Sequence, residues 1–103
     1  MMPQYLVVFR DPLSRLWELT AVYDNCRSFR CENVFTSTSE PIAEIASKHW
    51  LKLHPMVELI YDDNSQKFSG ERSSIYQFAL HGTRLLKQSC VVTPSTTGEK
   101  NEL

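Results

Sequence analysis

Glycine and cysteine are scarce in this sequence, and their scarcity excludes several kinds of site. The three glycines are scattered, so no glycine-rich loop can hold a phosphate, and the G-x-S-x-G motif of many hydrolases is absent. The three cysteines, Cys26, Cys31 and Cys90, are odd in number and are not spaced as a disulfide framework. We therefore expect reduced thiols, a reducing compartment and no cofactor.

Long apolar runs and an excess of one charge are also missing. No apolar run reaches the roughly 18 residues of a membrane-spanning helix, and residues 1–4 lack the basic and apolar parts of a signal peptide. Eleven Lys and Arg residues face twelve Asp and Glu residues, a net charge of −1, which attracts neither nucleic acid nor an anionic membrane to the whole chain. The sequence predicts a cytoplasmic protein that does not contact a membrane.

The composition is that of a small globular domain. Hydrophobic residues make up 42% of the chain and charged residues 22%, which is far from the pattern of a disordered protein. From Thr93 onward the only apolar residue is Leu103, so this segment cannot offset the entropy lost on ordering. We predict one domain over residues 1–92 and a disordered tail over 93–103.

Four segments have the pattern of β-strands. Residues 4–10 are apolar without alternation, which predicts a central strand covered on both faces. Residues 15–24 alternate, with Trp17, Leu19, Ala21 and Tyr23 on one face. Residues 28–36 alternate as well, with Phe29, Cys31 and Phe35 on one face, although a short helix over 26–34 is an alternative. Residues 56–61 complete the set.

Two segments have helical spacing. Over residues 40–54, Ser39 can cap the helix, Pro41 suits the first turn and Pro55 disfavours helical geometry at His54. The predicted inner stripe of this helix is Ile42, Ile45, Ala46, His49, Trp50 and Leu53. Residues 75–86 carry a second stripe: Ile75, Phe78, Ala79, Gly82, Leu85 and Leu86. A helix with Gly82 in close packing is favoured there, with a strand over 75–80 as the alternative.

These elements predict an α+β fold. The order is βββαβα, and the expected architecture has two layers, with a four-stranded, mostly antiparallel sheet packed under two helices. If both helices cover one face, the other face keeps an apolar patch with a polar rim, formed by Leu6, Val8, Leu16, Val22 and Val34. Such a patch is typical of an interaction site, so we predict a homodimer or a protein partner on the outer sheet face.

A zinc site is the sharpest formal motif, but its geometry is poor. Cys26, Cys31, His49 and His54 occur in the order of a zinc finger. A five-residue offset points the two thiols to opposite faces of a strand and turns the two imidazoles about 140° apart on a helix. We therefore expect no metal.

The remaining candidates leave the function open. His49 lies within the predicted apolar stripe and is a candidate pocket residue for a small enzyme or ligand-binding protein. Arg15, Arg27 and Arg30 lie among aromatic residues and are candidate contacts to nucleic acid. Because the catalytic motifs are absent, the favoured hypothesis is a small non-enzymatic interaction or regulatory module that self-associates.

Deleting residues 93–103 tests the domain boundary. Because the tail has no apolar stripe to dock, we expect the free energy of unfolding to stay within about 0.5 kcal/mol of the full chain. Urea unfolding of the two proteins measures this. A loss of several kcal/mol would mean that the tail packs on the domain.

Overall fold

A computed structural model describes residues 2–24, 28–62 and 70–92, and the predicted tail lies outside the described residues. The elements in chain order are β1 (Tyr5–Arg10), β2 (Trp17–Asp24), β3 (Phe29–Ser37), α1 (Glu40–Leu53), β4 (Glu58–Tyr61) and α2 (Gly70–Val92). The α+β class and the βββαβα order predicted from the sequence are confirmed. Residues 75–80 are helical, and α2 begins before its predicted start.

The four strands form one mixed sheet in the order β3-β2-β1-β4. β1 pairs antiparallel with β2, and β2 pairs antiparallel with β3, whereas β1 and β4 are parallel. The sheet is therefore mostly antiparallel, as predicted. β1 lies inside it, and β3 and β4 form its two edges.

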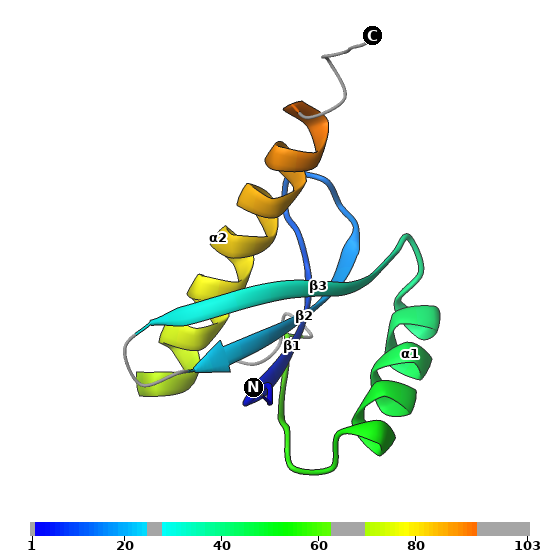
Figure 1. The fold of residues 1–103 in the computed structure, drawn as a ribbon. Coiled ribbons are helices and arrows are strands. Elements are labelled where there is room, and N and C mark those ends of the chain that lie inside the picture. The colour runs from blue at the N-terminus through cyan, green and yellow to red at the C-terminus, as the bar shows by residue number, and fades with distance from the viewer. Residues whose placement is uncertain (1, 25–27, 63–69, 93–103) are drawn as a thin grey trace, which may run out of the picture.

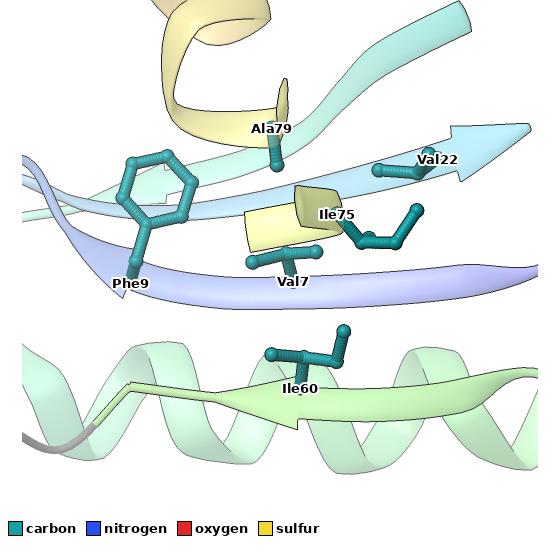
Figure 2. Close-up of a cluster of buried hydrophobic side chains, with 6 residues drawn as sticks. All are labelled: Val7, Phe9, Val22, Ile60, Ile75 and Ala79. Atoms are coloured by element: carbon teal, nitrogen blue, oxygen red, sulfur yellow. The ribbon is translucent and has the colours of Figure 1, made fainter. Parts of the chain in front are cut away.

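The two helices cover opposite faces of this sheet (Figure 1). On one face α2 closes a buried cluster, drawn in Figure 2, that consists of Val7, Phe9, Val22, Ile60, Ile75 and Ala79. On the other face α1 closes a second cluster, which contains Leu6, Val8, Trp17, Leu19 and Ala43. The expected two-layer arrangement is thus corrected to three layers. Successive β1 side chains point to opposite faces, and all four central ones are apolar and buried, so each face needs its own cover.

A β-bulge changes the predicted alternation of β3. Thr20 pairs with Asn33 but Leu19 pairs with Phe35, so Val34 is the extra residue. Paired residues share a face, which places Phe35 on the α1 side rather than beside Cys31. Thr36 then faces α2 opposite Glu18.

The ends of α1 are as predicted, and its inner face is predicted in part: Ala46 and Trp50 pack against the core, whereas the other members of the predicted stripe are exposed. Ser39 caps the helix by accepting a hydrogen bond from the Ile42 amide at 3.4 Å, and α1 ends before Pro55. The fully buried positions are Ala43 and Ser47, whereas His49 is exposed. The surface of α1 that meets the sheet is therefore turned from the predicted stripe toward Ala43 and Ser47, whose small side chains allow a close approach to the strands.

Replacing Ile75 and Ile45 separately by alanine tests both helix orientations. Ile75 is buried, so Ile75→Ala should lower the free energy of unfolding by about 2 to 5 kcal/mol. Ile45 is exposed, so Ile45→Ala should change it by less than about 0.5 kcal/mol. Urea unfolding gives both values. If both variants lost the same free energy of unfolding, Ile45 would be buried against the sheet, as the sequence predicts.

Candidate functional site

The predicted sheet-face interface is not an exposed patch. Leu6 and Val8 are fully buried under α1, and Val22 is fully buried under α2. Val34 is half-buried against the α1 cluster, and Leu16 is half-buried beside the β1–β2 turn. The predicted patch requires one sheet face without a helix, but each face of the sheet is covered by a helix.

Two members of the predicted arginine cluster, Arg15 and Arg30, lie far apart. Arg15 is exposed in the β1–β2 turn, where its φ of 68° is left-handed. Arg30 belongs to β3 and pairs with Tyr23, near the other end of β2. Its guanidinium carbon lies 4.4 Å from the centre of the Tyr23 ring. The length of β2 separates the two arginines by roughly 20 Å. Arg27 lies outside the described residues.

The histidine and cysteine candidates are also dispersed. His49 is exposed on the outer face of α1, and His54 instead stacks on Trp50 with ring centres 3.9 Å apart. Cys31 is half-buried under α2, and burial raises the pKa of its thiol to about 11. Cys26 lies outside the described residues. Within residues 2–24, 28–62 and 70–87, no three His, Cys, Asp or Glu side chains converge in the manner of a metal site.

Tyrosine hydroxyls engage many of the carboxylates. All four tyrosines donate a hydrogen bond to an acidic side chain, in the pairs Tyr5–Glu71, Tyr23–Glu32, Tyr61–Glu40 and Tyr76–Asp62. The bond to Glu71 raises the pKa of Tyr5 to about 12. Glu58 pairs with Arg72. These contacts join separate elements, so these carboxylates help to hold the elements of the fold together.

A buried polar layer lies between α2 and the sheet, and sequence reasoning missed it. The Glu18 carboxylate is fully buried and accepts hydrogen bonds from Asn33 at 3.0 Å and Thr36 at 2.6 Å. Its other oxygen lies 3.1 Å from the Lys87 ammonium, a charge contact without hydrogen-bond geometry.

The same layer joins β2 to α2 through two threonines. Thr20 and Thr83 share a buried hydrogen bond of 2.6 Å. The available sequence signal was a matched polar pattern, since Glu18 and Thr20 alternate on a strand while Thr83 and Lys87 are four apart on a helix. The predicted arrangement, with both helices on the other face, leaves the Glu18 face of β2 exposed and so indicates no buried partner for this carboxylate.

Asp11 anchors the C-terminal half of α2 to the end of β1. Its carboxylate is buried, lies 3.2 Å from an Arg84 guanidinium nitrogen and accepts a hydrogen bond from the Leu13 amide at 2.8 Å. Burial alone would raise the pKa of Asp11. The hydrogen bonds from Arg84 and Leu13 outweigh burial and hold this pKa below its ordinary value of 3.8.

Large apolar side chains are exposed on the outer face of α1. Ile42 is 51% exposed, Ile45 68% and Leu53 67%. At 100° per residue these positions and His49 fall within an arc of about 80°. We call Ile42, Ile45, His49 and Leu53 the outer stripe.

No described helix is long and apolar enough to cross a membrane.

Two shallow grooves flank the helices. The α2–β3 groove, of about 330 Å³, has a lining that includes Phe29, Arg30, Phe78, His81, Leu85 and Leu86. The second, of about 300 Å³, lies between α1 and β4 and is lined by Glu40, Glu44, Ser47, Lys48, Leu59 and Tyr61. His49 lines neither groove, so the predicted pocket at this residue is not found in them.

Comparison with known proteins identifies no family. No family model, no curated protein and no solved structure matches the chain. The function is therefore argued from the geometry alone.

Replacing Asp11 by asparagine tests the ion pair with Arg84. The folded-state pKa of Asp11 lies below that of the unfolded chain, so its ionisation stabilises the fold above about pH 4, and this contribution is lost as the pH falls. Asp11→Asn should cost about 1 to 2 kcal/mol at neutral pH, and the difference from the parent should shrink below about pH 3. Urea unfolding across this range measures it.

The exposed carboxylate of Glu44, which pairs with Lys48 one turn away, provides the control. Glu44→Gln should change the free energy of unfolding by less than about 0.5 kcal/mol. A constant Asp11→Asn difference at every pH would contradict the assigned ion pair.

Proposed function

We propose that this chain is a small non-enzymatic interaction module that presents the outer stripe of α1 to a partner protein. The observation that carries the proposal is the exposure of Ile42, Ile45 and Leu53. A helix that is apolar on its inner and its outer face is one that is normally buried on both. The sheet covers only the inner face of α1.

The spacing of the stripe suits a helix lying in an apolar groove. Its residues recur at intervals of three and four, the arrangement of anchors in helix-in-groove recognition. Lys48 and Lys52 lie along one border of the stripe and are exposed. The fitting partner is a protein with an apolar groove and an acidic rim on one side.

The energy available from the stripe sets a limit on this contact. Full burial of an Ile or Leu side chain gives about 1.5 to 3 kcal/mol, so the remaining exposure of three such residues is worth roughly 3 to 5 kcal/mol. Association itself costs at least about 4 kcal/mol. The stripe alone therefore supports weak binding, and contacts at the lysine border or a second binding event must add to it.

The positions of the other candidates favour binding over catalysis or nucleic-acid recognition. Asp11 and Glu18 are held inside the fold by Arg84 and Lys87. Arg15 and Arg30 are too far apart for one phosphate-binding patch. These placements support the proposal without identifying the partner.

Site-specific photo-crosslinking in an extract of the source cells tests the proposal. A photoreactive amino acid in place of Ile45 should give a discrete protein adduct, because this position would lie at the centre of the contact. The same amino acid in place of Gln77, exposed on α2, is the control.

Adding Leu53→Glu to the Ile45 probe should abolish the adduct, because a carboxylate would be buried in the apolar contact. Circular dichroism checks that the variant folds, as an exposed substitution should allow. An adduct of equal yield at Gln77, or one that persists with Leu53→Glu, would contradict a specific role for the stripe.

A further inference from the structure

β3 is a long edge strand of the sheet formed by the described residues. It pairs with β2 on one side, and on its other side the described residues place no strand. β4, the opposite edge, is short at four residues, whereas β3 has nine and contains neither Pro nor Lys, residues that commonly block edge pairing. The bulge at Val34 leaves residues 29–33 as the regular part of this edge.

We propose that two copies of this chain pair antiparallel along β3, with the two-fold axis passing beside Cys31. A two-fold axis perpendicular to the sheet keeps every side chain on its own face, so the pairing must centre on a residue. If the pairing is centred on Cys31, Arg30 of each copy lies opposite Glu32 of the other copy. The result is one continuous eight-stranded sheet.

The charges of β3 favour this register. Arg30 and Glu32 are exposed on the same face of β3. Tyr23, which pairs with Arg30, lies under the Arg30 guanidinium and donates a hydrogen bond of 2.8 Å to Glu32. Pairing centred on Arg30 or on Glu32 would set two like charges directly opposite each other, which is unfavourable. Pairing centred on Cys31 makes two complementary pairs.

The position of α2 leaves room for the second copy. Gly82 lies against Cys31, close enough that an added Cβ would be 2.7 Å from the sulfur, while the adjacent Thr83 bonds to Thr20 of β2. α2 therefore crosses over the boundary between β3 and β2. With strands about 4.8 Å apart, the two α2 axes would lie about 10 Å apart near the two-fold axis, a normal distance for packed helices.

The α2–β3 groove provides the apolar contact for this arrangement. Phe29 packs on Phe78 with ring centres 5.2 Å apart, and both line the groove together with the exposed Leu85 and Leu86. These side chains face the space between the two α2 helices of the dimer. A foreign strand would cover the same edge without this charge match, so we assign the groove to a second copy.

Paired charge reversals test the proposal by light scattering at micromolar to high micromolar concentration. The parent should have a mass near twice 11.9 kDa. Arg30→Glu sets Glu against Glu twice, and Glu32→Arg sets Arg against Arg twice, so each should raise the dimer dissociation constant at least about tenfold. An equimolar mixture of the two variants should recover the dimer, because every facing pair is again complementary.

The exposed Glu44→Lys variant is the matched control, and it should remain dimeric because α1 lies outside this interface. Hydrogen exchange gives a second readout, since outward amides of residues 29–33 should gain protection as concentration rises. A monomeric parent, a dimer insensitive to both reversals, or a mixture that stays monomeric would each overturn the proposal. None of these outcomes depends on the partner of the outer stripe.

Discussion

The need to cover β1 on both faces determines the arrangement of this protein. Leu6 and Val8 point to one side of the strand, Val7 and Phe9 to the other, and all four are fully buried. A strand of this kind is stable only between two layers. α1 and α2 therefore pack on opposite faces of the sheet, and the inner surface of each helix is buried in the core. Among the described residues, the surfaces left for binding include the outer side of each helix, the groove between α1 and β4, and the edge at β3.

The sequence predicts the elements better than their orientations. Alternation, the cap at Ser39 and the stop at Pro55 are local signals, and they locate strands and α1 correctly. Which face a helix covers depends on contacts between distant segments. Of the apolar stripe predicted for α1, Ala46 and Trp50 pack inward but Ile45 is exposed, because the helix presents the small side chains of Ala43 and Ser47 to the sheet. Hydrophobicity alone would predict that the stripe with the bulkier apolar side chains packs against the sheet.

The buried charge of Glu18 is a second feature that local reasoning cannot supply. Its partners come from β3 and from α2, so nothing near it in the sequence indicates burial. The Glu18–Lys87 pair, in which Glu18 is fully buried and Lys87 is partly exposed, adds little net stability, but leaving Glu18 without its partner is costly. Here it makes one placement of α2 much better than a shifted one, because only that placement brings Lys87 to Glu18 and Thr83 to Thr20. The polar layer thus specifies where α2 lies, and with it the position of the α2–β3 groove.

The two proposed surfaces would strengthen each other. A two-fold axis perpendicular to the sheet brings both copies of α2 together on one face and leaves both copies of α1 on the opposite face. The dimer would then present two outer stripes in the same direction. One stripe offers only weak binding, as the exposed area of Ile42, Ile45 and Leu53 implies. Two stripes on a rigid sheet convert the second contact into an intramolecular one, which raises the overall affinity for a partner that offers two matching grooves. The proposed pairing at β3 would in this way supply the second binding event that the weak α1 surface needs.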